Sequence, residues 1–130
     1  MKNTSLKMIL LAICFGPAPV LAGAAEGVWK TGADAKGQIA YVTARRCGPA
    51  LCGQITEVLS PQGQRIDHPN VGRKVFWDMR ETGAGNYQGR AFVPALGRDY
   101  AATMKVSGQK MTVRGCFGPV CKSQIWTRLK

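Results

Sequence analysis

The chain has 130 residues, 45% of them hydrophobic, with 18 basic and seven acidic side chains and a formal net charge of +11. This length favours one domain rather than several, and the charge either attracts anionic partners or only keeps the protein soluble. The single histidine and the lack of a phosphate-binding glycine loop or a nucleophile-elbow serine disfavour the common enzyme classes.

The first 25 residues have the three-part pattern of a secretory signal peptide. Lys2 and Lys7 precede an apolar run over residues 8–15, and small residues fill positions 22–25. The apolar run is shorter than the roughly 20 residues that span a bilayer. We therefore expect cleavage after Ala24 or Ala25, a periplasmic or secreted mature chain over residues 26–130, and no transmembrane span in it. Sixteen basic and seven acidic residues remain there, a net charge of +9.

Four cysteines remain in the expected mature chain, in two stretches of identical spacing, CGPALC and CFGPVC. In a small exported domain this arrangement predicts two disulfides. Each pair flanks a Gly-Pro turn, which favours the local bridges Cys47–Cys52 and Cys116–Cys121, each stabilising by roughly 2 kcal/mol. Crosswise bridges stay open, as does a zinc site of four thiolates, which an oxidising compartment disfavours.

Short segments with alternating polarity, separated by turn residues, predict strands, and no stretch shows helical periodicity. We expect strands over residues 27–30, 38–46, 52–59, 74–79, 87–93, 98–106, 109–116 and 121–129, and a long loop over residues 60–73. Short connections make neighbours antiparallel, and closure removes the exposed sheet edges. The predicted fold class is all-β, a single small antiparallel meander barrel of about eight strands.

The register of the last hairpin follows from its cysteines. If Cys116 pairs with Cys121 across the turn, both lie on the outer face with Ile125, while Trp126 and Arg128 point inward. A bulge at Gly115 would reverse this arrangement.

Several segments together resemble one known family. They are the opening Gly27-Val28-Trp29, the run CGPALCGQI, the segment GRAFVPALGRDYAATM and the ending VRGCFGPVCKSQIWTRL. The chain resembles the bacterial exported family catalogued as domain of unknown function 2147. This resemblance implies a lipocalin-like small β-barrel with no established activity. The short, basic stretch 73–86 departs from the family pattern.

A wider resemblance to lipocalins implies a structural lock. In that fold a Gly-x-Trp on the first strand packs its indole against a basic side chain of the last strand. Trp29 and Arg128 match these positions, and such a cation–π contact contributes roughly 0.5 to 2 kcal/mol.

Two functions remain open. The first is a non-catalytic binding module for a small apolar or amphiphilic, lipid-like ligand, with Arg73, Phe76, Trp77, Tyr87, Arg98 and Tyr100 as candidate binding residues. The second is a structural or interaction protein of the cell envelope whose basic surface meets an anionic component. An interior lined by the small Ala91 and Ala102 would support the first function. An interior filled by Trp77, Met104, Met111 and Trp126 would support the second.

An enzyme is the least favoured function. His68 lies in a proline-rich loop, and nothing in the sequence brings two acids such as Asp78 and Asp99 together. We therefore expect no catalytic residue, no cofactor, no metal and no nucleic-acid partner, and a monomeric protein.

Overall fold

The computed structural model describes residues 24–130, so most of the predicted signal peptide, residues 1–23, lies outside the described residues. Strands are the only regular secondary structure in these residues: β1 (Gly27–Lys30), β2 (Ile39–Cys47), β3 (Ala50–Leu59), β4 (Arg65–Ile66), β5 (Lys74–Gly83), β6 (Asn86–Val93), β7 (Arg98–Ser107), β8 (Lys110–Phe117) and β9 (Val120–Arg128). The predicted all-β class is confirmed. Over residues 24–130 we find no helix with the length and hydrophobicity needed to cross a bilayer.

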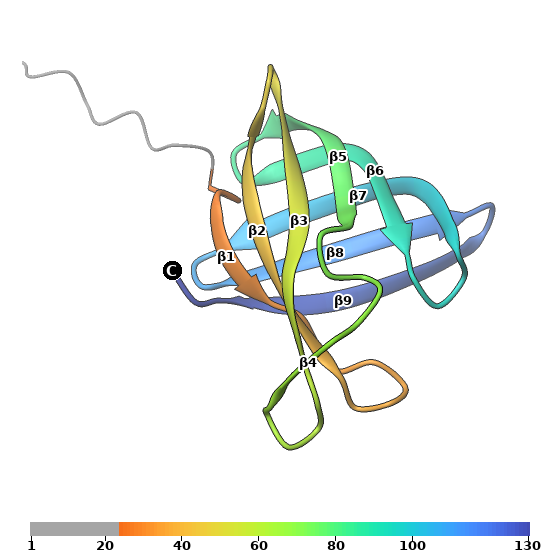
Figure 1. Ribbon diagram of the computed structural model, residues 1–130. Helices are drawn as coiled ribbons and strands as arrows, with labels where there is room; N and C mark the ends of the chain where they lie inside the picture. Colours follow the sequence, from red (N-terminus) through yellow and green to blue (C-terminus); the bar gives the residue numbers. More distant parts are fainter. Residues whose placement is uncertain (1–23) are drawn as a thin grey trace, which may run out of the picture.

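Eight of these strands close into a barrel (Figure 1). Each strand is antiparallel to the next, and β1 completes the ring because it pairs with both β2 and β9. Trp29 lies opposite Val42 on one side and opposite Arg128 on the other. The predicted meander barrel of about eight strands is therefore confirmed.

The ninth strand, β4, lies within the segment predicted to be a loop. It pairs only with the end of β3, where Val58 is opposite Ile66 and Leu59 is opposite Arg65. The turn before it closes by hydrogen bonds between Ser60 and Gln64, and Gly63 takes a positive φ of 81°. A strand of two residues is too short to show alternation, so its sequence carries no strand signal.

The two ends of the barrel differ. The end that we call the closed end carries β1's start, the C-terminus and the β7–β8 turn. The open end carries the β6–β7 turn (residues 94–97) and the β8–β9 turn (residues 118–119). In Figure 1 these two turns lie on the side away from the C-terminus.

Large apolar side chains fill the barrel. The fully buried ones in the core are Trp29, Val42, Phe76, Met79, Met104 and Met111. The last hairpin has the predicted register, since Cys116 lies opposite Cys121 without a bulge. Trp126 is accordingly 6% exposed and Ile125 is 60% exposed.

A bulge in β5 allows two large residues three positions apart to face the core. Trp77 pairs with Arg90 and Arg80 pairs with Gln88, which leaves Asp78 and Met79 without a regular partner in β6. Asp78 has a φ of 52°, a backbone conformation that aspartate tolerates better than most residues. The bulge shifts the alternation by one residue, so Phe76 and Met79 are both buried and Trp77 is left half-buried.

Phe76 depends on a glycine across the sheet. A Cβ on Gly53 would lie 2.5 Å from Cζ and 2.7 Å from Cδ1 of the Phe76 ring. The ring therefore occupies the space that any side chain at position 53 would need, and it reaches Trp126, whose ring centroid is 6.2 Å away.

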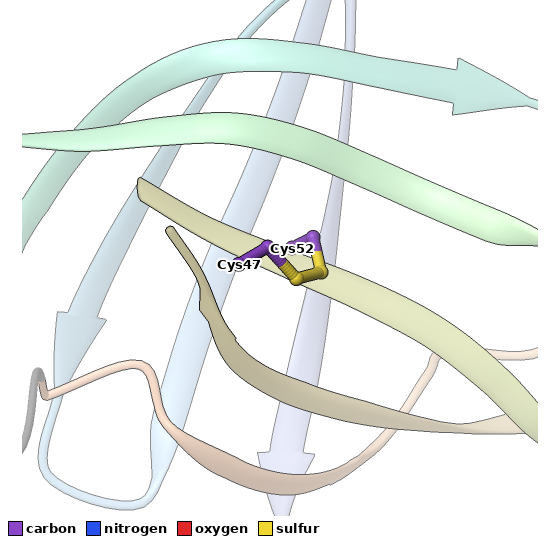
Figure 2. The surroundings of a disulfide bond; sticks show 2 residues. All are labelled: Cys47 and Cys52. Atoms are coloured by element: carbon purple, nitrogen blue, oxygen red, sulfur yellow. A yellow bond between two sulfur atoms is a disulfide. The ribbon is translucent and has the colours of Figure 1, made fainter. Parts of the chain in front are cut away.

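Both disulfides are local, as the sequence favoured, and Figure 2 shows the one between Cys47 and Cys52. The two hairpins nevertheless differ in register. Cys116 lies directly opposite Cys121, with a Cα–Cα distance of 4.1 Å, whereas Cys47 lies opposite Ala50 and bridges diagonally to Cys52 over 5.8 Å. The position of Gly-Pro causes the difference, because it directly follows the first cysteine in one stretch and comes one residue later in the other.

Candidate functional site

Trp29 and Arg128 seal the closed end. The Arg128 guanidinium lies over the Trp29 ring, 4.3 Å from its centroid. Arg128 Nη1 donates to the Glu26 carbonyl at 2.6 Å, and Nη2 donates to the Ala24 carbonyl. The Trp29 indole N–H donates to the Ala25 carbonyl at 2.8 Å. These contacts join the first and last strands, which is the arrangement that the lipocalin resemblance implies.

Tyr87 belongs to the same end. Its ring is 2% exposed, and its hydroxyl accepts a hydrogen bond from the Ala25 N–H at 3.3 Å. Burial raises the pKa of Tyr87 above its ordinary value of 10.0. Tyr87 is therefore a neutral core residue at the sealed end.

The middle of the barrel is occupied by protein. Met104, Met111 and Trp126 are 1%, 0% and 6% exposed, and Ala91 and Ala102 are buried beside them. Trp77 takes no part in this filling, but the other three large residues do, which is the arrangement expected of a structural or interaction protein and leaves no deep ligand pocket here. Two hollows, of about 360 and 390 Å³, lie on the surface near β3–β4 and near the β2–β3 turn, and the lining of neither includes Met104, Met111 or Trp126.

The inner face of the sheet becomes accessible at the open end. We call this area the inner shelf and define it by Val93, Arg98, Tyr100, Ala102, Gly115 and Lys122. The register places them on one face, since Ala102 lies opposite Gly115, Gly115 lies opposite Lys122, and Val93 lies opposite Arg98. Ala102 is buried at the base, Tyr100 is half-buried, and Arg98 and Lys122 are exposed.

Gly115 leaves free space on the inner shelf. A Cβ at this position would meet only Cγ2 of Val93, at 4.0 Å. Beside it the Tyr100 ring contacts Phe117 edge-on, with centroids 5.8 Å apart and an interplanar angle of 71°. The shelf is therefore an apolar area with room for additional atoms.

Gln124 separates the shelf from the filled core. Its Oε1 accepts the Trp126 indole N–H at 2.6 Å, and its Nε2 donates to the Gly32 carbonyl at 3.1 Å. The amide satisfies the polar atom of the buried indole and holds the β1–β2 loop against β9. On the inward face of β9, Gln124 thus lies between Trp126 of the core and Lys122 of the inner shelf.

The shelf is positively charged. The ion pairs of residues 24–130 join Arg46 to Glu26, Arg65 to Glu57, and Arg90 to Asp99, so Arg98 and Lys122 take part in none of them. Asp99, the acid nearest in sequence, pairs with Arg90 at 2.6 Å, and its hydrogen bond with that guanidinium lowers its pKa. The arrangement can hold an anionic group next to an apolar one.

The candidate residues from the sequence are dispersed. Arg98 and Tyr100 lie on the shelf, whereas Phe76 and Tyr87 are buried in the core. Arg73 stacks on Phe92, 4.3 Å from the ring centroid, and Phe92 lies opposite Asp99 on the outer face with the half-buried Trp77.

Sequence reasoning missed Val93, Gly115 and Lys122. The Cys116–Cys121 pairing held the signal for two of them. This pairing sets the β8–β9 register, which places Gly115 opposite Lys122. The β7–β8 hairpin places Ala102 opposite Gly115, so all three side-chain positions face inward.

His68, the one histidine of the chain, is a loop residue. His68 Nδ1 accepts the Asn70 N–H at 3.1 Å within the surface hollow near β4. Within the described part of the chain, no three histidine, cysteine, aspartate or glutamate residues are placed to hold a metal ion.

Comparison with solved structures gives a lipocalin-like neighbour. It is described as protein HP1028 from the human pathogen Helicobacter pylori, which belongs to the lipocalin family. The two chains share 15% identity, the alignment covers 81% of this chain and 82% of the other, and the TM-score is 0.65. This likeness shows the fold. Comparison with curated proteins gives no match.

The family comparison covers almost the whole barrel. The match extends over residues 27–128, from the first residue of β1 to the last residue of β9. The chain therefore belongs to the family described as "Uncharacterized protein conserved in bacteria (DUF2147)".

Proposed function

We propose that the protein is a binding module that holds a small anionic amphiphile on the inner shelf. The observation that carries this proposal is the free space over Gly115, which lies on an apolar face flanked by two unpaired cations, Arg98 and Lys122. The acyl part of the ligand would lie on Ala102, Gly115 and Tyr100, and its acidic head would meet the two cations.

The filled middle of the barrel limits the ligand. Met104, Met111 and Trp126 leave no room for a long chain to descend toward the closed end. The proposal is therefore a short apolar segment held at the open end, with part of the ligand exposed to solvent. Such a shallow site gives a lower affinity than a deep calyx, because less apolar area is removed from water.

The test uses a fluorescent single-chain probe, 11-(dansylamino)undecanoic acid, kept below its aggregation concentration. Emission of the dansyl group increases in an apolar environment, so titration gives an affinity. Gly115→Val places a side chain in the free space and is expected to weaken binding by at least about tenfold, because the lost contact area is comparable to several methylene groups. Ser123→Val adds the same side chain to the exposed outer face and serves as the matched control.

Charge gives a second arm of the experiment. Arg98→Glu with Lys122→Glu is expected to weaken laurate binding and to strengthen dodecyltrimethylammonium binding, because the sign of the shelf is inverted. The proposal fails if the wild-type protein does not bind the probe, or if Gly115→Val binds it as tightly as Ser123→Val does.

A further inference from the structure

The open end also presents exposed apolar side chains beyond the shelf. Leu96, in the β6–β7 turn, is 49% exposed, and Phe117 and Val120, which flank the β8–β9 turn, are 67% and 61% exposed. The two turns lie at the same end of the barrel (Figure 1). We call these three residues the apolar tips.

The tip of the β8–β9 hairpin is braced by a disulfide and has few backbone N–H groups in its turn. The Cys116–Cys121 disulfide joins its strands directly below Phe117 and Val120, which lie opposite each other. Gly118 and Pro119 form the turn, where Gly118 has a φ of 56° and Pro119 carries no N–H. A turn with few unpaired backbone donors loses little when it leaves water.

The charges around the tips have one sign. Arg98 follows the first turn and Lys122 follows the second, and both are exposed. Asp99, the acid next to Arg98, is paired with Arg90. An anionic lipid surface has two layers, with phosphate headgroups outside and acyl chains beneath them. The apolar side chains at the two turns suit the acyl layer, and the unpaired cations that follow them suit the phosphates.

We propose that the protein docks on an anionic lipid surface by its open end, with Leu96, Phe117 and Val120 entering the interface and Arg98 and Lys122 contacting the phosphates. Docking does not require a ligand on the inner shelf. It turns the shelf toward the membrane, so an amphiphile leaving the bilayer reaches it directly.

The test is co-sedimentation of the full exported protein with vesicles of phosphatidylglycerol and phosphatidylcholine, compared with vesicles of phosphatidylcholine alone. The variant Phe117→Ser/Val120→Ser is expected to lower partitioning by at least about tenfold, because two apolar side chains no longer leave water. Ile125→Ser is the matched control, since Ile125 is 60% exposed on the outer face of the same strand. It is expected to bind within about twofold of the wild type.

A second measurement reports on insertion itself. The emission that the new tryptophan of Phe117→Trp adds to that of the three native tryptophans is obtained by subtracting the wild-type spectrum. This added emission is expected to shift to the blue on anionic vesicles and to be quenched by brominated acyl chains, because the introduced indole lies below the headgroups. Docking is refuted if the wild type does not sediment with anionic vesicles, if Ile125→Ser loses as much as the tip variant, or if the introduced tryptophan is not quenched. Gly115→Val is expected to retain vesicle binding, so failure of docking and failure of ligand binding are distinguishable.

A separate observation at the closed end bears on maturation of the chain. Ala25 is 0% exposed and belongs to the core cluster, whereas Ala24 is exposed. The Ala25 carbonyl accepts the Trp29 indole N–H, and its N–H donates to the Tyr87 hydroxyl. Removal of Ala25 would leave the Trp29 indole and the Tyr87 hydroxyl without these partners. Removal of Ala24 takes away the carbonyl that accepts Arg128 Nη2, while Arg128 Nη1 keeps its hydrogen bond to the Glu26 carbonyl.

We infer that processing hydrolyses the Ala24–Ala25 peptide bond, so that the mature chain begins at Ala25. Water adds across this bond and leaves a carboxylate on Ala24 and an ammonium group on Ala25. Ala22-Gly23-Ala24 supplies the Ala-x-Ala pattern that a signal peptidase recognises. The new ammonium would lie beside the Tyr87 hydroxyl and one residue from Glu26, whose Oε1 is ion-paired with Arg46 at 3.4 Å.

Intact-mass measurement of the exported protein tests this inference. We expect the mass of residues 25–130 with two disulfides. A chain that begins at Glu26, or one that keeps the leader, overturns it. A chain made to begin at Glu26 is expected to melt at a lower temperature than one beginning at Ala25, and equal melting temperatures would contradict the role of the buried alanine.

Discussion

Gly53→Ala tests most sharply whether the barrel interior is filled. The added methyl group would lie 2.5 Å from Cζ and 2.7 Å from Cδ1 of Phe76, closer than any real carbon contact. Phe76 is 0% exposed and lies beside Trp126 in the core, so its ring can move away from position 53 only by displacing other buried side chains. Adding a methyl group to a packed core costs typically 1–3 kcal/mol, and we expect about 2 kcal/mol, or roughly 10 °C in melting temperature.

The assay is equilibrium unfolding in urea, followed by tryptophan fluorescence. The midpoint is expected to fall while the slope stays unchanged, because the surface exposed on unfolding is the same. Gly115→Ala is the matched control on the same face, since its Cβ has room. It is expected to be neutral or to stabilise by about 0.5 kcal/mol through reduced freedom of the unfolded chain.

A double substitution identifies the contact. Phe76→Leu in the Gly53→Ala background is expected to recover part of the lost stability, because leucine lacks the ring edge that collides with the new methyl group. The coupling between the two positions is then read from the double-mutant cycle. The reasoning is refuted if Gly53→Ala costs as little as Gly115→Ala, or if the coupling is absent.

Three further predictions follow from the disulfides and the two shifted pKa values. Replacing Cys116 and Cys121 by serine is expected to lower the free energy of unfolding by about 2 kcal/mol, measured in urea, and an unchanged midpoint would contradict the role of that bridge. The lowered pKa of Asp99 means that its stabilising effect is present above the ordinary carboxyl value of 3.8 and is lost as pH falls through the lowered value; thermal scans should show a smaller acid loss in Asp99→Asn than in wild type. The raised pKa of Tyr87 has the opposite effect: its contribution to the free energy of unfolding is complete below pH 10.0 and is lost as pH rises through the raised value. Tyr87→Phe should therefore lose less stability at alkaline pH than the wild type. An unchanged alkaline profile would refute the assignment.

The barrel was predictable from the sequence because its physical causes are local. Alternation in residues 98–116, short turns and the even spacing of the cysteines each constrain neighbouring strands. The β8–β9 register followed from one pairing, Cys116 with Cys121, which placed Trp126 inside and Ile125 outside. The extra strand β4 was missed because two residues are too few to alternate.

The candidate site was harder to predict because it depends on which barrel end stays open. Phe76 and Tyr87 are aromatic residues in regular strands, and nothing local distinguishes a core position from a ligand contact. The bulge at Asp78 also turned Trp77 outward, against the simple alternation of β5. The sequence marks Gly115 only as a possible bulge residue. The register across three strands places it on the inner face opposite Ala102, and the space around it appears only in the packed structure.

Chemical-shift mapping tests the central claim most directly. Titration of the ¹⁵N-labelled protein with monomeric laurate should perturb the backbone amides of Tyr100, Ala102, Gly115 and Lys122 and leave those of the closed end, Trp29 and Tyr87, unchanged. Perturbations centred on the closed end or spread evenly over the basic outer surface would contradict a ligand site on the inner shelf.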